Sequence, residues 1–259
     1  ASNQNERTNP GVENYKLQRL LARIIINNSL RPVGVADLAG LRNILRDYSD
    51  GLAIPKELIQ NADDAGATEV TLIYDSRANL QWRETVMGRR MADCQGPCLW
   101  AHNDAQFTDD DFKNLLSLGG ATKEAQAAKV GKFGLGFNAV YNLTDVPAVL
   151  SGCQLQLLDP HGEKRAAASW RRLNFSKEAG RRMLAKYPHQ FAPYTGVMGC
   201  GPDLGAEPYP GTLIRLPLRT QEQAGESQIC QRAYSEQEMR DLLDKTAQQA
   251  RHLLLFTQS

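Results

Sequence analysis

The fold of this chain is decided by the stretch Glu57-Leu-Ile-Gln-Asn61-Ala-Asp-Asp64-Ala65, which has the pattern of an amphipathic helix. On a helix, Glu57, Asn61 and Asp64 lie at positions i, i+4 and i+7, so they project from one stripe. A carboxylate and an amide one turn apart suit magnesium-assisted phosphoryl transfer. The amide oxygen is a hard ligand for Mg²⁺, and the carboxylate can orient or deprotonate a water molecule. By itself, the stripe is more typical of an acidic helix face in solvent.

A glycine-rich turn lies further along the chain and reads Gly131-Lys-Phe-Gly134-Leu-Gly136-Phe137. Backbone N–H groups in such a turn can converge on an anion, and residues 137–141 are predicted to begin a helix. The turn is not a Walker-type phosphate loop, because no Lys-Ser/Thr pair follows. Nor is it a dinucleotide-binding loop, because Ala139 stands where the third glycine belongs. Alone it is also typical of a flexible hinge; only together do the helix and the turn indicate a nucleotide pocket.

Hydrophobic spacing predicts the other elements of one large α+β domain. The early segments have helical spacing, and the later strands do not alternate regularly with helices, which argues against a doubly wound sheet. The predicted helices cover 12–26, 36–47, 54–65, 108–118, 176–186 and 235–243 or beyond, and the predicted strands cover 69–74, 97–101, 155–158, 211–218 and 252–256, with a loop over 76–96.

Bulk composition excludes several classes of protein. The net charge is +1, so no whole-molecule field attracts nucleic acid or an anionic membrane. No apolar run approaches a membrane span, because Arg23 interrupts the longest candidate, residues 20–26. Five scattered cysteines predict thiols in a reducing compartment, and Cys94 and Cys98 lack the further ligands of a structural zinc site. We therefore expect a cytoplasmic protein with neither nucleic-acid nor membrane partners.

The segment from Lys164 to Lys186 is locally basic, with Glu178 as its single acidic residue. One interpretation is a solvated helix face, and the other is a docking surface for an acidic partner. The amino terminus, residues 1–10, is polar and unlike a signal peptide. We expect the chain to be part of a longer protein.

Together the motifs resemble the GHKL ATPase family, whose nucleotide-binding domain is also called the Bergerat fold. This family includes gyrase, histidine kinases and the ninety-kilodalton heat-shock chaperones. The matching pattern is Glu57-x-x-x-Asn61 with Asp64-Ala65, then Gly131-x-Phe-Gly134-x-Gly136-Phe137, then Gly211-Thr212 before a strand.

Longer stretches are similar to the chaperone-like repeats of the sacsin family. They are residues 56–70, residues 133–141, Thr144-Asp-Val-Pro147 and Leu158-Asp-Pro-His161. Asp47-Tyr-Ser-Asp-Gly51 and Leu254-Leu-Phe-Thr-Gln-Ser259 are most similar to the third of the large repeats. The resemblance covers roughly residues 35–259.

This resemblance implies a two-layer α/β sandwich with a mixed, mostly antiparallel sheet covered by helices on one face. It places a GHKL-type domain at 35–259 after an extension with an amphipathic helix at 1–34, and a lid over the nucleotide at 119–137. The implied function is an ATP-binding chaperone or co-chaperone module with ATP or ADP and Mg²⁺ as cofactors. Neighbouring repeats of the same chain and client or co-chaperone proteins are its implied partners.

The resemblance also implies that hydrolysis by this chain is slow. In the chaperone relatives, a following domain supplies an arginine to the terminal phosphate, and such residues contribute strongly to phosphoryl transfer. This chain ends at Ser259, before any such domain. We therefore expect a weak ATPase at most.

Roles are carried over residue by residue. Glu57 matches the general base, Asn61 the magnesium ligand, and Thr212 the threonine near the adenine. The remaining nucleotide-binding positions are Asp64 and Ala65 at the mouth of the pocket, Thr122 and Lys123 in the lid, and Gly131, Phe133, Gly134, Gly136 and Phe137 on the phosphate side.

One motif departs from the family pattern Asp-x-Gly-x-Gly, whose aspartate accepts from the adenine amino group. Here the segment is His102-Asn-Asp-Ala-Gln-Phe107, and either Asn103 or Asp104 faces the base. A hydrogen bond to a charged group contributes about 1.5–3 kcal/mol and a neutral one about 1 kcal/mol. If Asn103 faces the base, ATP affinity falls roughly tenfold. Ala105 and Gln106 add side chains where glycine allows close approach.

The alternative function follows from that departure. In it, the domain keeps the GHKL fold, binds no nucleotide and serves as a structural or protein-interaction module.

Overall fold

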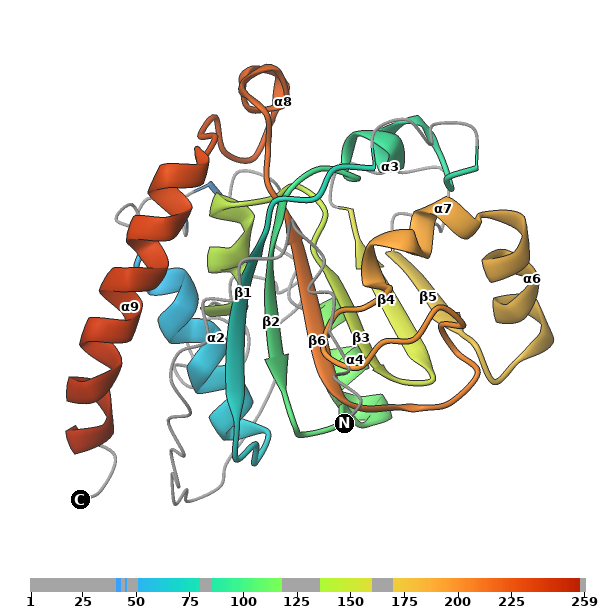
Figure 1. Ribbon diagram of the computed structural model, residues 1–259, viewed down its shortest axis with the longest axis horizontal. Coiled ribbons are helices and arrows are strands. Elements are labelled where there is room, and N and C mark those ends of the chain that lie inside the picture. Colours follow the sequence, from blue (N-terminus) through green and yellow to red (C-terminus); the bar gives the residue numbers. More distant parts are fainter. Residues whose placement is uncertain are drawn as a thin grey trace, which may run out of the picture.

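Figure 1 shows the computed structural model of the chain, which describes residues 41–42, 45, 51–79, 85–117, 136–159 and 170–256. Six strands form one open sheet in the order β1-β2-β6-β3-β4-β5, and every neighbouring pair is antiparallel. The strands are β1 (Val70–Asp75), β2 (Cys98–Asn103), β3 (Ala148–Gly152), β4 (Gln154–Leu158), β5 (Trp170–Asn174) and β6 (Tyr209–Pro217). The predicted α+β class is confirmed, and the arrangement is consistent with a GHKL-type sandwich.

The helices lie before, between and after these strands. They are α2 (Ala53–Asp64), α3 (Arg89–Asp93), α4 (Asp109–Ser117), α6 (Glu178–Lys186), α7 (Pro188–Phe191), α8 (Gln221–Glu226) and α9 (Glu236–Phe256), with 3-10 helices η1 (Gly136–Asn142) and η2 (Ala192–Tyr194). The predicted helix at 12–26 lies outside the described residues. Within 36–47 only Leu41, Arg42 and Leu45 are described, and these are helical.

Helix α2 begins and ends as its sequence predicts. Pro55 lies in its first turn, where the missing N–H has no helical partner to lose. Past its end, Gly66 adopts φ +79°, a left-handed conformation that favours glycine. The Gly66 N–H donates to the Asp63 carbonyl (2.8 Å), and the Ala67 N–H donates to the Ala62 carbonyl (2.9 Å). These two bonds form a Schellman cap, which satisfies carbonyls at the helix end.

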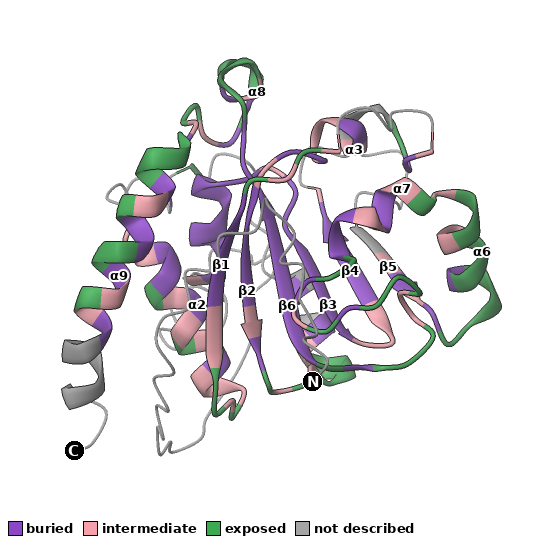
Figure 2. Cartoon of the chain, viewed as in Figure 1, coloured by how far each residue is buried: buried purple, intermediate pink, exposed green. Residues whose placement is uncertain are grey.

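Both faces of the central strands are buried (Figure 2). Because side chains alternate along a strand, Leu72, Leu99 and Ile214 face one side. Helices α2, α4, α9 and η1 pack there and bury Ile54, Leu58, Phe112, Phe137, Met239 and Leu242. This is the helix-covered face that the family resemblance implies.

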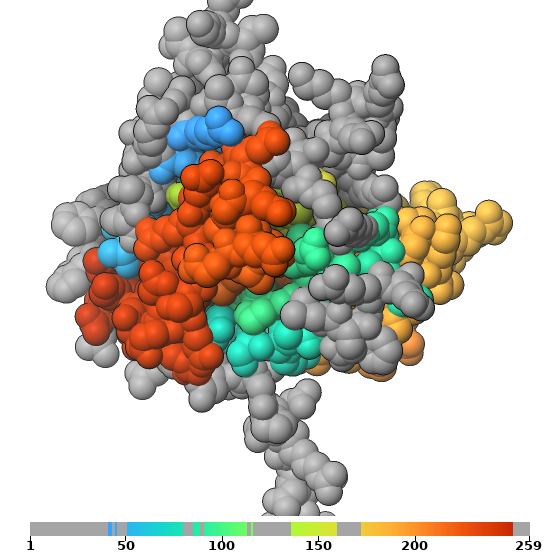
Figure 3. All heavy atoms as spheres, turned by 90° about the horizontal axis from the view of Figure 1, so that it is seen from above, coloured from blue at the N-terminus to red at the C-terminus, as the bar shows by residue number. Residues whose placement is uncertain are grey.

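The opposite face of the sheet is covered by the chain from α6 to η2. Trp100 and Leu213 point to this side and pack with Phe191 and Tyr194. The Trp100 and Tyr194 rings meet edge to face, with centroids 5.1 Å apart. In Figure 3, which views the molecule from above, the yellow atoms of the α6 region protrude at the edge opposite the orange and red atoms of α8 and α9.

The predicted strand at 252–256 is wrong, because α9 continues to Phe256. A capping box starts this helix: the Glu238 N–H donates to Ser235 Oγ, and the Ser235 N–H donates to the Glu238 carboxylate. Its buried side chains keep helical spacing at Met239, Leu242, Leu243, Thr246 and Ala250. The short apolar run at 253–256 does not distinguish helix from strand by itself, and here it extends an established helix.

Other elements depart less from expectation. The predicted loop at 76–96 contains the short helix α3, and the predicted helix after Gly136 is the 3-10 helix η1. Strands β3 and β5 were not predicted. The basic helix at 176–186 is confirmed as α6; Lys177, Arg181, Arg182 and Lys186 are exposed around it, and Arg182 pairs with Glu178. Lys164 and Arg165 lie outside the described residues.

Candidate functional site

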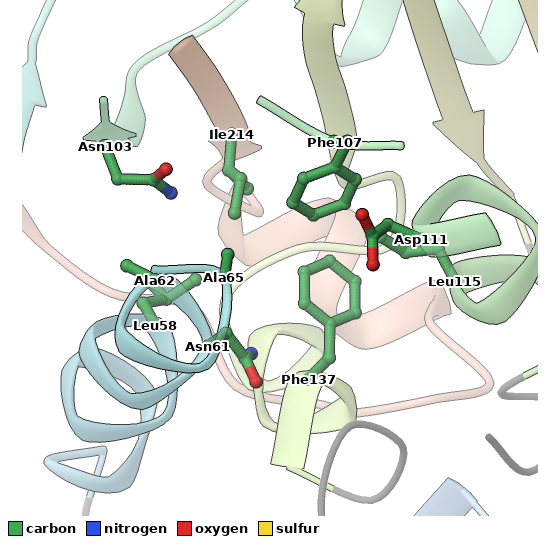
Figure 4. A pocket seen from close by; sticks show the side chains of 10 residues that line it. All are labelled: Leu58, Asn61, Ala62, Ala65, Asn103, Phe107, Asp111, Leu115, Phe137 and Ile214. Carbon is green, nitrogen blue, oxygen red and sulfur yellow. The ribbon is translucent and has the colours of Figure 1, made fainter. Parts of the chain in front are cut away.

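A cavity lies between the sheet and the helices that cover it (Figure 4). Its volume is about 60 Å³, several times the roughly 10–15 Å³ that one water molecule needs. Helix α2, strands β2 and β6, helix α4 and η1 all contribute to its wall. The lining residues are Leu58, Asn61, Ala62, Ala65, Asn103, Phe107, Asp111, Leu115, Phe137 and Ile214.

Helix α2 presents Asn61 to this cavity. The buried residues Ile54, Leu58 and Ala62 fix the rotation of the helix against the sheet. Asn61 and Ala65 then line the cavity. Within the described part of the chain, the Asn61 side-chain amide makes no hydrogen bond, so its oxygen is available to a ligand. Asp64 is half-buried and does not line the cavity.

The Glu57 carboxylate lies directly against Gly136, the last glycine of the predicted turn. A Cβ atom built on Gly136 would lie 1.8 Å from Glu57 Oε2. This distance is too short for two heavy atoms, so any residue other than glycine would require the carboxylate to move. Gly136 therefore allows Glu57 to approach the backbone at the start of η1. Phe137, the next residue, lines the cavity. The helix stripe and the end of the turn thus come together in space.

The rest of the predicted phosphate side and the lid cannot be placed in the same way. Gly131, Phe133 and Gly134, together with Thr122 and Lys123, lie outside the described residues. Their roles stay predictions.

Asn103 and Asp104 point in different directions from the end of β2. Asn103 is buried and lines the cavity, where Figure 4 shows its side chain directed inward. Asp104 is exposed and binds the start of β1 instead. Its Oδ1 accepts from the N–H groups of Thr68 (2.7 Å) and Glu69 (3.0 Å), and its Oδ2 accepts from the Thr68 hydroxyl. In this structure the position that faces the cavity carries an amide.

Thr212 lies beneath the 103–107 segment and does not line the cavity. Its hydroxyl is fully buried and donates to the Ala105 carbonyl (2.8 Å). Ser151, a residue that sequence reasoning missed, lies 3.0 Å from the Thr212 hydroxyl. Its Oγ accepts from the Phe107 N–H (2.9 Å) and donates to the Gly211 carbonyl (2.8 Å). These bonds hold the segment that carries Asn103 against β3 and β6.

Phe107 and Asp111 also line the cavity and were not predicted as site residues. Phe107 packs edge to face on Phe112, with ring centroids 5.4 Å apart. The Asp111 carboxylate accepts from the N–H and hydroxyl of Thr108, both at 2.7 Å. The cap-and-acid signature at 108–111 predicted the start of α4 but gave no sign that it borders a cavity.

The cysteines show no metal site within the described residues, where no group of three or more His, Cys, Asp or Glu side chains is placed to hold an ion. Burial raises the pKa of the Cys98 thiol to about 12. Among the residues that the structure describes, no helix is both long and apolar enough to cross a lipid bilayer.

Asp104→Asn should lower stability without changing the cavity. Burial works to raise the pKa of Asp104, but hydrogen bonds from Thr68 and Glu69 outweigh it and hold the pKa below the usual value. The stabilisation is therefore present above the unfolded pKa of about 3.9 and is lost as pH falls through the folded pKa. We expect Asp104→Asn to cost about 1 kcal/mol at pH 7, or about 2–4 °C in Tm.

Thermal unfolding at pH 7 and near pH 3 measures this effect. The difference between the two proteins should shrink at the lower pH. A variant with the same loss of stability at both values would show that the charge of Asp104 is not responsible.

Comparisons with known proteins agree on one family. The family model described as the Sacsin domain matches residues 38–259. The chain is also 40% identical to human Sacsin over 228 residues, which cover 85% of this chain and 5% of that protein. The chain therefore spans only a small part of the length of this relative.

Proposed function

The chain belongs to the Sacsin domain family, and we propose that it is a nucleotide-binding, chaperone-type module of a large multidomain protein. It takes Mg·ATP into the cavity between α2 and the sheet and hydrolyses it slowly. The observation that carries the proposal is the placement of the Glu57 carboxylate against Gly136, beside a cavity wall that contains Asn61 and Asn103.

Each group has a role in this proposal. Asn61 holds Mg²⁺ through its amide oxygen, a type of ligand that Mg²⁺ accepts together with water and phosphate oxygens. Glu57 orients and deprotonates the attacking water. The adenine base of the nucleotide lies among the apolar side chains of Leu58, Phe107 and Phe137, and Asn103 faces the edge of its ring. Bound Mg²⁺ supplies charge neutralisation at the phosphates.

The lid proposed for residues 119–137, with Thr122 and Lys123, closes over the nucleotide together with the glycines 131, 134 and 136. Closure changes the contacts of the domain with neighbouring repeats of the same chain and with client or co-chaperone proteins. We place this activity in the cytoplasm.

Calorimetric titration with Mg·ATP and Mg·ADP tests the proposal directly, and thermal unfolding gives a second readout. At a ligand concentration one hundred times its dissociation constant, a ligand that binds only the folded protein stabilises it by about 2.7 kcal/mol. For a chain of this size, Tm should rise by about 5–10 °C. No heat of binding and no rise in Tm at millimolar Mg·ATP would exclude ATP binding.

A second candidate function is an interaction domain that binds no nucleotide. Two observations favour it. The cavity presents the amide of Asn103 where the family pattern has a carboxylate, and the Thr212 hydroxyl donates to the Ala105 carbonyl rather than toward the cavity. The titration separates the two functions, because this one predicts no response to nucleotide.

A further inference from the structure

The orientation of the Asn103 amide follows from its neighbour. Its Oδ1 accepts from the Ala105 N–H at 3.1 Å. The opposite orientation would place the side-chain NH₂ group against a backbone N–H, where two donors repel each other. Asn103 therefore directs its Nδ2 and two N–H donors toward the cavity (Figure 4).

These donors face a cavity with room for a few water molecules. Asn103 is only 5% exposed, and among the described residues its Nδ2 has no acceptor. A ligand that presents an acceptor at this point can replace such a water molecule and keep its hydrogen bond.

The wall around these donors is mostly apolar and would contact a ring that enters the cavity. Leu58, Phe107, Phe137 and Ile214 surround the space in front of Asn103. The carboxylate of Asp111 is held by Thr108, at the start of its own helix. At the other end of the cavity, Asn103 Nδ2 offers hydrogen-bond donors to the edge of a ring.

We infer that Asn103 makes the base subsite favour a purine nucleotide with a carbonyl oxygen at position 6 over one with an amino group there. The inference rests on the proposed function, since it names which nucleotide enters that same cavity. The family resemblance implies that position 103 or position 104 faces the 6-position of the base, and of the two only Asn103 lines the cavity. A 6-carbonyl accepts from Nδ2, whereas the 6-amino group of adenine brings a donor to a donor. An aspartate at this position would have the opposite preference.

Inosine triphosphate is the sharpest probe, because its base differs from that of ATP only by the 6-carbonyl and the accompanying proton on N1. Calorimetric titration of the unmodified chain should give a dissociation constant for Mg·ITP about three- to tenfold below that for Mg·ATP, the range that one neutral hydrogen bond supports. Asn103→Asp should reverse the order. Asp104→Asn, next to it but outside the cavity, should leave the order unchanged.

The titrations distinguish a wrong base preference from a failure of the domain to bind any nucleotide. Tighter binding of Mg·ATP than of Mg·ITP by the unmodified chain overturns the inference and leaves nucleotide binding in place. The same preference in Asn103→Asp as in the unmodified chain also overturns it. Failure of both nucleotides to bind overturns the proposed function and the inference with it. Asn103→Asp keeps an oxygen for the Ala105 N–H, and the comparison in the unmodified chain decides the question even if that variant does not fold.

Discussion

Replacing Glu57 with glutamine is expected to slow ATP hydrolysis by about 10²–10⁴-fold, the usual contribution of a general base. Glutamine has the same shape as glutamate and keeps the contact with Gly136, but it cannot take a proton from water. Nucleotide affinity should stay within about twofold, because in the proposed role Glu57 contacts the attacking water and not the nucleotide. Phosphate release with protein in excess over ATP measures the rate, and calorimetry measures the affinity.

The matched control is Glu226→Gln, which neutralises an exposed carboxylate on α8. It should hydrolyse ATP at the rate of the unmodified chain. Equal rates for Glu57→Gln and the unmodified chain would remove the general-base role from Glu57. Loss of both binding and hydrolysis would instead show that the carboxylate supports the structure around Gly136.

Arg219→Met is expected to destabilise the fold by about 3–5 kcal/mol, the cost of leaving a buried charge without its partner. The Arg219 side chain is 2% exposed and that of Asp145 16% exposed. Arg219 Nε donates to Asp145 Oδ1 at 2.7 Å. Its other nitrogens donate to three carbonyls at and just after the end of η1, those of Tyr141, Asn142 and Thr144. The substitution leaves all four acceptors without this donor.

Denaturant unfolding at pH 7 measures this loss, which corresponds to a fall in Tm on the order of 10 °C. Arg182→Met is the matched control, because Arg182 and Glu178 form an exposed pair on α6 with side chains 76% and 71% exposed. Exposed pairs contribute at most about 1 kcal/mol. If both variants lost the same small amount, the buried network would not be stabilising. Asp145→Asn, which keeps the shape of the side chain, gives a second measurement should Arg219→Met fail to fold.

The local elements were predictable where the chain carries its own signals. Helix α2 has Pro55 in its first turn and Gly66 after its last, and its apolar residues keep helical spacing. Strand β6 contains the β-branched residues Thr212 and Ile214, with Pro210 and Gly211 near its start and Pro217 at its end. The run at 252–256 lacked such signals. Strands β3 and β5 were not predicted, although β4, which has the same length, was. Their identity depends on the neighbours with which they pair.

The candidate site was predictable only in part. Asn61 on the stripe of α2 lines the cavity, and Glu57 lies beside Gly136, while the roles predicted for both residues stay predictions. The contributions of Phe107, Asp111 and Ser151 were not apparent, because they depend on how α4 packs on the sheet and on the pairing of β3 with β6. The roles of the turn and lid residues 119–134 stay predictions.

The sequence by itself determined the family of this chain, the helix that carries the carboxylate and amide, and the glycine beside which that carboxylate lies. Only the tertiary structure decided which of Asn103 and Asp104 faces the cavity. Alternation along β2 places Asn103 on the same side as Leu99 and Ala101, but both sides of this strand are buried. Periodicity therefore does not say which side the helices cover. The choice depends on Thr68 and Ala105, whose hydrogen bonds hold the two side chains apart.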